Sequence, residues 1–383
     1  MQMNEAQAPS AASTQPDEEE KTRPDSGFIT FSKGIWWFVK DQWFIISLLL
    51  LVLISSQAQV PEQQQHVKST VVQNLAVAVI FFINGCTIPT NILLQNIRRW
   101  HIHLFIQIMC FLLTSSTALG VVTAAATNPT FMDPALLNGI TVLGCLPTAL
   151  SFNTTMTKKS RGNDALTLTE SVIGSLLGPL VSAALIQLYS SIDSWYTQTL
   201  PKTPAGYGEV FKQVFQQLGL TLFLPLVVGQ VVLWLFPNST KRVMTTYKAS
   251  KLASLSLLTL IWSAYDGAFE TGSFSSLKPS NIVFFVFISV ALCLFWAIAA
   301  MLASILWLPK EDCIAIVFCV STKTPALGVP LINLVFAEIT QVDSAKMCIP
   351  MVVFQCVQTC LGSIATIMFR KWVEKANTHS QSA

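Results

Sequence analysis

Apolar residues in this chain gather into long runs, and short polar segments separate the runs. Each run holds about 20 residues, which is the length that an α-helix needs to cross a bilayer. We therefore expect an all-α polytopic membrane protein with ten transmembrane helices, at residues 36–54, 71–90, 102–126, 136–156, 164–190, 211–236, 249–268, 281–308, 312–336 and 345–369.

The polar segments predict how the chain is divided. Residues 1–35 are polar and rich in Pro and Ser, which predicts a disordered cytoplasmic tail. The longest polar connection, at 191–210, separates a first group of five spans (36–190) from a second group of five (211–369). A short cytoplasmic tail is expected at 370–383. Residues 191–210 are expected on the extracellular or lumenal side.

Lysine and arginine predict the orientation of the chain. If the N-terminus lies in the cytoplasm, 17 of these residues fall in inner segments and 5 in outer segments, and Lys323 falls inside a span. Basic residues are enriched on the cytoplasmic side of membrane proteins, so both termini are expected in the cytoplasm. Because five is an odd number, the second group of spans enters the membrane in the opposite orientation, as in an inverted repeat.

The fourth span of each half is interrupted by proline. GCLPTALSFNTTM (144–156) holds Pro147, and FCVSTKTPALGVP (318–330) holds Lys323 and Pro325. Proline removes a helical hydrogen bond. Paired interruptions in matching spans are typical of a transporter's binding site, because unwound backbone presents free dipoles there. We expect helix breaks at Pro147 and Pro325.

Polar side chains near these interruptions predict a cavity for an ion or a solute. Their oxygens can coordinate hard cations, but Ser, Thr, Asn and Gln also form ordinary hydrogen bonds between helices. Both interpretations stay open for any single residue. The candidate cavity residues are Gln107, Asn153, Thr154, Thr167, Glu170, Ser171, Ser321, Thr322 and Lys323.

Two of these residues carry charge inside a span. A charge at the bilayer centre costs about 2.5–3.5 kcal/mol on insertion scales, so it usually has a partner. We hypothesise that Glu170 and Lys323 face one central cavity and are electrostatically coupled. The alternative is that Glu170 lies near the inner mouth and pairs with a loop residue such as Arg161. His101 and His103, next to basic residues, are expected to be solvated.

Composition excludes several other classes of protein. Charged residues make up only 11% of the chain, against roughly 25% in soluble globular proteins. A net charge of +3 gives no reason to expect a nucleic-acid partner. The nine cysteines form neither a metal-ligand pattern nor a disulfide framework. The sequence has no P-loop and no nucleophile elbow, so we expect neither an enzyme nor a bound metal or cofactor.

Several stretches resemble the bile acid:sodium symporter superfamily, specifically its member-7 branch with fungal relatives. They include IFFINGCTI (80–88), HLFIQI (103–108), the region 140–165, ESVIGSLLG (170–178), the region 312–338 and QTCLGS (358–363). The resemblance covers residues 43–372. It implies two inverted five-helix repeats, arranged as a panel and a core in which unwound helices four and nine cross.

The resemblance also implies a set of sodium ligands. In sodium-coupled members, the positions matched by Asn153, Thr154, Thr167 and Ser171 join a ninth-helix Glu at one sodium site, and the position of Gln107 contributes to a second. Here the shared Glu is replaced by an apolar residue close to Val317, and Ser321, Thr322 and Lys323 follow. Adding an ammonium and removing a carboxylate disfavours a bound cation. Either Glu170 supplies a replacement carboxylate, or Lys323 itself replaces the cation, and sodium coupling stays open.

Three functions are consistent with the resemblance. The first is a transporter-like protein that restrains calcium entry into the cytosol, in the plasma membrane or alternatively in the Golgi or endoplasmic reticulum. The second is a sodium- or proton-coupled symporter of an organic anion, with Lys323 as the counter-charge of the substrate. The third is a regulator of a calcium-influx channel without a transport cycle. The expected partners are the lipid bilayer, an unidentified small solute or ion, and in the third case that channel.

Overall fold

The computed structural model describes residues 43–87, 98–200, 212, 216, 219–275, 277–336 and 341–381. The predicted tail at 1–35 and the second half of the connection at 191–210 lie outside these residues. The chain from Phe44 onward forms one compact unit. All regular structure in the described ranges is helical, which confirms the predicted all-α class.

The helices of the first half follow the predicted runs, and two of the runs are divided. A five-residue π-helical turn, η2, interrupts the third run, and a break at 146–149 interrupts the fourth. The elements are α2 (Trp43–Gln57), α3 (Glu62–Val67), η1 (Lys68–Val72), α4 (Gln73–Thr87), α6 (Trp100–Ile108), η2 (Met109–Leu113), α7 (Thr114–Ala125), α8 (Pro134–Cys145), α9 (Leu150–Lys159) and α10 (Asp164–Ser190).

The helices of the second half also follow the predicted runs, and here too the fourth run is divided. Its fourth run is broken at 322–324, and its last run lies inside a helix that continues beyond the predicted end at residue 369. The elements are η3 (Gly219–Phe223), α12 (Leu224–Leu235), α13 (Pro237–Thr245), α14 (Ser250–Glu270), α15 (Pro279–Ser304), α16 (Lys310–Ser321), α17 (Pro325–Val335) and α18 (Gln341–Gln381).

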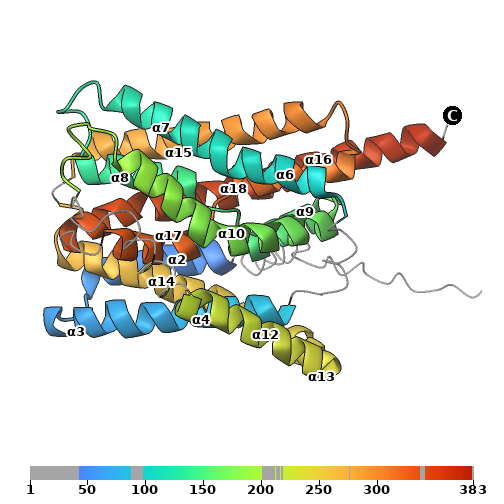
Figure 1. The fold of residues 1–383 in the computed structure, drawn as a ribbon, viewed down its shortest axis with the longest axis horizontal. Coiled ribbons are helices and arrows are strands. Elements are labelled where there is room, and N and C mark those ends of the chain that lie inside the picture. The colour runs from blue at the N-terminus through green and yellow to red at the C-terminus, as the bar shows by residue number, and fades with distance from the viewer. Residues whose placement is uncertain are drawn as a thin grey trace, which may run out of the picture. The chain divides into compact units, whose positions relative to one another are not determined.

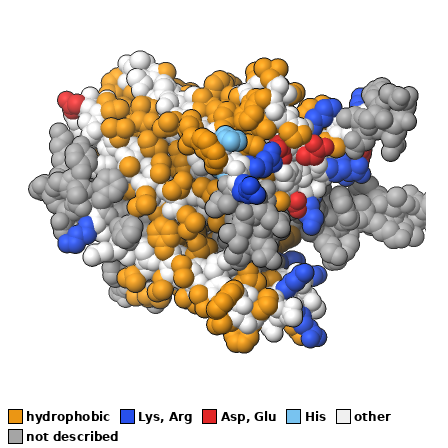
Figure 2. All heavy atoms as spheres, turned by 45° about the vertical axis from the view of Figure 1, so that its right-hand side comes forward, with side chains coloured by type: hydrophobic (Ala, Val, Ile, Leu, Met, Phe, Trp, Pro, Cys, Tyr) orange, Lys and Arg blue, Asp and Glu red, His pale blue; other side chains and the backbone are white. Residues whose placement is uncertain are grey.

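Length and composition allow many of these helices to cross a membrane. Among the described residues, six helical stretches pass both criteria, and a seventh does if α12 and α13, which are bent by 114°, count as one span. Three shorter apolar helices, at Ile46–Gln57, Gln73–Thr87 and Pro134–Cys145, are further candidates. Figure 2 shows apolar side chains spread over the middle of one face and most basic side chains to one side of them. Such a surface suits lipid.

Two sets of helices pack closely within this unit. In one, α4 lies against α12 and α14; in the other, α7 and α18 pack on α8, while α9 and α16 pack on α10. Figure 1 shows α4 and α12 running side by side. Gly85 and Gly229 face each other there, and a Cβ at either one would overlap a backbone carbonyl of the facing helix. Small residues allow helices to approach this closely in membranes.

Three helices, α6, α10 and α16, begin beside a shared carboxylate. Asp312, in the first turn of α16, accepts hydrogen bonds from Arg99, just before α6, and from Asn163 Nδ2 at 2.7 Å. The Asn163 side chain in turn caps α10 by accepting from the Leu166 N–H at 3.0 Å. Negative charge is favourable at helix N-termini. Asp312 therefore holds the starts of α6, α10 and α16 together.

The contact at Gly85 and Gly229 gives a stability prediction. Gly229→Ala places a methyl group against the Phe82 carbonyl. Because this overpacks the contact, we expect the free energy of unfolding to fall by about 1–3 kcal/mol. The matched control is Gly267→Ala on α14, where a Cβ meets nothing within 4 Å. Thermal unfolding of the purified proteins in detergent measures both. Equal unfolding midpoints for Gly229→Ala and the wild type would contradict the close contact between α4 and α12.

Candidate functional site at the crossing of two broken helices

Two interrupted helices meet at the centre of the unit. The α8 helix ends at Cys145 and α9 begins at Leu150, with Pro147 between them. The α16 helix ends at Ser321, and α17 begins at Pro325, whose fixed φ angle suits the first helical position. The two interruptions touch directly, since the Thr324 N–H donates to the Pro147 carbonyl at 3.1 Å.

A glutamine of α18 holds the unwound peptide of Lys323. The Lys323 N–H donates to Gln358 Oε1 at 2.8 Å, and Gln358 Nε2 donates to the Lys323 carbonyl at 2.9 Å. One amide side chain thus replaces both helical hydrogen bonds that the backbone lacks at this position. Buried backbone groups need such partners, so Gln358 stabilises the break.

The Lys323 side chain is 1% exposed and reaches across the crossing to the end of α8. Its ammonium donates to the Cys110 carbonyl at 2.7 Å, to Thr114 Oγ1 at 2.8 Å and to the Leu146 carbonyl at 2.8 Å. The ring of Trp296 lies 5.4 Å from the same nitrogen. Three oxygens and an aromatic face therefore surround a buried positive charge.

Four successive carbonyls at the end of α8 have donors from other parts of the chain. The Gly144 carbonyl accepts from Thr114 Oγ1 at 2.9 Å and that of Cys145 from Ser182 Oγ at 2.7 Å. The next two, at residues 146 and 147, bind the Lys323 ammonium and the Thr324 N–H. The last carbonyls of a helix lack partners within the helix. Here the crossing segment 322–324 provides two of the partners, and helices α7 and α10 provide the other two.

The π-helical turn η2 provides the first of the oxygens that bind Lys323. Such turns are rare, and they recur at functional sites because they disturb the helical hydrogen-bond ladder. The Cys110 carbonyl lies within this turn and accepts a hydrogen bond from the Lys323 ammonium. The interruption of the third span thus contributes directly to the binding of Lys323.

Glu170 lies apart from Lys323 and has other partners. It is fully buried on α10, where it contacts His103 Nδ1 and accepts from Gln107 Nε2 at 2.9 Å. Among the described residues no ion pair joins Glu170 to Lys323, and their electrostatic coupling across one cavity stays a prediction. The alternative partner named for Glu170 is engaged elsewhere, because Arg161 pairs with Glu374 at 3.0 Å. His103 is buried rather than solvated, whereas His101 is exposed.

Two of the positions that match sodium ligands have hydrogen-bond partners within the protein. Asn153 Oδ1 accepts from the Thr322 hydroxyl at 2.6 Å, and Asn153 Nδ2 donates to the Thr148 hydroxyl. The Thr167 hydroxyl donates to that of Thr157 at 3.0 Å. Of the expected set, the structure therefore joins Asn153 with Thr322, and Gln107 with Glu170.

The remaining positions do not converge on a common point. The hydroxyls of Thr154 and Ser321 donate to carbonyls of their own helices, those of Leu150 (3.0 Å) and Val317 (2.7 Å). Ser171 is fully buried, near Cys319. The described residues also hold no group of three or more His, Cys, Asp or Glu side chains placed to bind a metal.

A cleft opens beside the crossing, between the broken helices and the pair α4 and α14. It holds about 700 Å³ of empty space, its open mouth included. Both half-helices α9 and α17 begin at its wall, and in the structure as described neither has a side-chain cap. The cleft is lined by Ile80, Phe81, Asn84, Pro147, Thr148, Ala149, Leu150, Phe152, Ser175, Ala253, Ser254, Leu257, Thr324, Pro325, Ala326, Leu327 and Gln355.

This lining changes the expected role of Lys323. The two break prolines line the cleft, but Lys323 does not, because its side chain turns toward α8. An ammonium fixed in that direction is not the counter-charge of a solute in the cleft. The polar groups available to a solute there come from the starts of α9 and α17 and from Asn84, Ser254 and Gln355.

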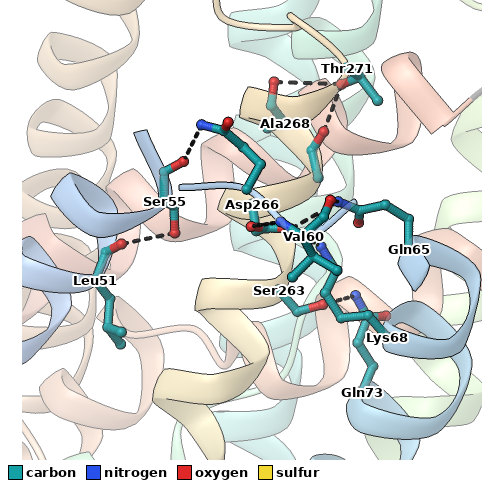
Figure 3. A network of polar contacts seen from close by, with 12 residues as sticks. Leu51, Ser55, Val60, Gln65, Lys68, Gln73, Ser263, Asp266, Ala268 and Thr271 are labelled. Atoms are coloured by element: carbon teal, nitrogen blue, oxygen red, sulfur yellow. Dashed lines mark hydrogen bonds and ion pairs between the residues drawn. The ribbon is translucent and has the colours of Figure 1, made fainter. Parts of the chain in front are cut away.

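A second buried charge pair was not predicted from the sequence. Asp266 on α14 is fully buried, forms an ion pair with Lys68 and accepts from Gln65 Nε2 at 2.9 Å and from the Val60 N–H at 3.0 Å. Figure 3 shows these three donors around the carboxylate, with Ser263 and Gln73 one turn away. An acidic residue inside an apolar run was the signal that could have identified Asp266, though not its partner.

The Lys68–Asp266 pair gives a second stability prediction. Asp266→Asn leaves Lys68 as a buried charge without its partner, so we expect the free energy of unfolding to fall by about 3–5 kcal/mol. The double variant Lys68→Met with Asp266→Leu removes both charges, so its free energy of unfolding is expected to fall less. Asp193→Asn, at an exposed position, serves as the control. If Asp266→Asn unfolds at the wild-type temperature, the pair does not stabilise the fold.

Sequence comparisons agree with this architecture. The chain matches the SBF-like CPA transporter family over residues 42–371. It is 31% identical to the solute carrier RCH1 of Candida albicans over 371 residues, covering 88% of this chain and 90% of the relative. Sodium/bile acid cotransporter 7 of Mus musculus is 26% identical over 344 residues, covering 87% and 94%. These relatives are named as transporters rather than enzymes. The matches confirm the resemblance seen in the sequence, and the chain belongs to the SBF-like CPA transporter family.

Proposed function

We propose that this protein is a transporter-like integral membrane protein that admits a small solute or ion to the cleft beside the crossing and restrains calcium influx into the cytosol. The observation that carries the transport part is the crossing itself. Two broken helices join through the Thr324–Pro147 hydrogen bond, and both half-helices begin at the wall of one cleft. Irregular backbone at membrane depth is tolerated where it is buried in protein or lines a cavity.

The arrangement of helices supports an inverted repeat of five plus five spans. The breaks at 146–149 and 322–324 fall in the fourth predicted span of each half. We assign α4, α12 and α14 to a panel, and the helices around α8, α10 and α16 to a core. The cleft then lies between panel and core, where a rigid movement of one against the other would open it to either side. We propose that both termini lie in the cytoplasm, as the distribution of Lys and Arg predicts.

A second candidate is a carrier of an organic anion. Helix N-termini carry a partial positive charge and attract anions. The starts of α9 and α17 both border the cleft, which favours a negatively charged solute over a cation there. The name of the murine relative, a sodium/bile acid cotransporter, is consistent with such a solute. The two candidates differ in what is moved, not in where it binds.

The calcium effect is proposed from the family resemblance and not from any single residue. The resemblance to the member-7 branch and its fungal relatives implies a limit on calcium entry. We place the protein in the plasma membrane, with the Golgi or endoplasmic reticulum as the alternative. If the protein acts through a calcium-influx channel instead of by transport, the cleft is not needed. That difference can be tested.

Cells without a protein of this family, loaded with a cytosolic calcium indicator, test the proposal. Expression of the wild-type chain should make the calcium rise after an external calcium pulse several-fold smaller. Leu257→Trp, which fills the cleft from α14, should remove most of this effect. Leu255→Trp is the matched control, because Leu255 lies two residues away on the same helix and is 50% exposed.

Surface expression of both variants has to match that of the wild type in the same cells. A calcium rise that the wild-type chain leaves unchanged contradicts the calcium function. Full restraint by Leu257→Trp contradicts a working cleft and favours the regulator of a channel. Sodium-dependent accumulation of a bile salt by the wild type would favour the organic-anion carrier.

A further inference from the structure

The surroundings of Lys323 have the composition of a small cation site. Two backbone carbonyls and one hydroxyl lie 2.7–2.8 Å from its nitrogen. The Thr114 hydroxyl directs its own hydrogen to a backbone carbonyl, that of Gly144 or of Cys110, and therefore presents a lone pair to Lys323. All three neighbours thus act as acceptors. Three acceptors match the three N–H groups of a charged ammonium.

The charge is stabilised without a carboxylate. In the described part of the chain Lys323 has no ion-pair partner, and the residue near the family's acidic position, Val317, is apolar and 3% exposed. The Leu146 carbonyl belongs to the end of α8, where the helix dipole is negative. Trp296 adds the attraction of an aromatic face for a cation. Dipoles and π-electrons therefore act in place of a counter-ion.

A sodium ion at this crossing would compete with existing hydrogen bonds and with the charge of Lys323. The Asn153 carbonyl oxygen, at a position that resembles a sodium ligand, is already bound by the Thr322 hydroxyl. The Glu170 carboxylate is bound by Gln107 and His103 on α6. A sodium ion would have to displace these donors and lie near a fixed positive charge, which raises its energy in a poorly screened interior. Of the positions that match sodium ligands, Asn153 is therefore engaged within the protein, whereas the Gln107 Oε1 atom is buried and has no hydrogen-bond partner among the described residues.

We propose that the Lys323 ammonium is a built-in cation that takes the place of a bound sodium ion at the crossing. The crossing is assembled by a charge that never leaves the protein, so its geometry does not depend on sodium. If the cleft transports a solute, as proposed above, the cycle proceeds without coupling to a sodium gradient. Only this last consequence rests on the proposed function.

Unfolding of the purified full-length protein in detergent tests the inference. The thermal midpoint is measured in sodium chloride and in N-methyl-D-glucamine chloride of equal ionic strength. The wild-type midpoint should be the same in both. Lys323→Ala removes the ammonium but leaves the three oxygens and a vacant space, so its midpoint should fall by several degrees. Sodium should then raise that midpoint, because a ligand that binds only the folded state stabilises it.

Lys323→Met separates the effect of charge from that of volume. Methionine fills the space but offers no donor, so this variant should be destabilised and sodium should not raise its midpoint. A sodium-dependent rise in the wild type overturns the inference, and that result stands even if a variant fails to fold. A folded Lys323→Ala protein that does not respond to sodium overturns it as well.

These measurements are independent of the calcium assay. A chain that leaves cytosolic calcium unchanged but shows sodium rescue of Lys323→Ala would refute the calcium function and retain the built-in cation. A chain that restrains cytosolic calcium but shows no sodium rescue of Lys323→Ala would retain the calcium function and refute the built-in cation.

Discussion

The crossing of the two broken helices depends on one buried ammonium. The end of α8 leaves carbonyls without helical partners in the protein interior, and Lys323, just after α16, adds a buried charge there. Each change alone is unfavourable, because unpaired polar groups and isolated charges are poorly solvated by protein or lipid. The Lys323 ammonium and the Leu146 carbonyl satisfy each other. The two interruptions therefore stabilise one another, and neither is expected to persist without its counterpart.

The other buried charges follow the same rule with different partners. Glu170 is satisfied by His103 and Gln107 of α6, and Asp266 by Lys68, Gln65 and the Val60 N–H. Each charge has several donors or acceptors, which a buried ion requires if its desolvation is to be offset. The three sites join different helices, so each one also restricts how those helices are oriented about their axes.

Much of the architecture was predictable from the sequence because it depends on local properties. Apolar run length placed the helices, and proline chemistry placed the breaks near Pro147 and Pro325. The partners of the buried charges were not predictable, because they depend on how each helix is rotated against its neighbours. His103 was expected to be solvated because basic residues surround it in the sequence, yet it faces inward. Asp266 and Lys68 lie far apart along the chain, so no local pattern pairs them.

The π-helical turn in the third span has a consequence for how one helix serves two opposite charges. An inserted residue rotates the rest of the helix by about 100° relative to an unbroken one. Before η2, Gln107 and His103 bind the acidic side chain of Glu170; within and just after it, the Cys110 carbonyl and Thr114 bind the basic Lys323. The third span thus supplies separate hydrogen-bond partners to an acidic and a basic side chain. Because each charge has its own partners, Glu170 and Lys323 do not need to pair with each other.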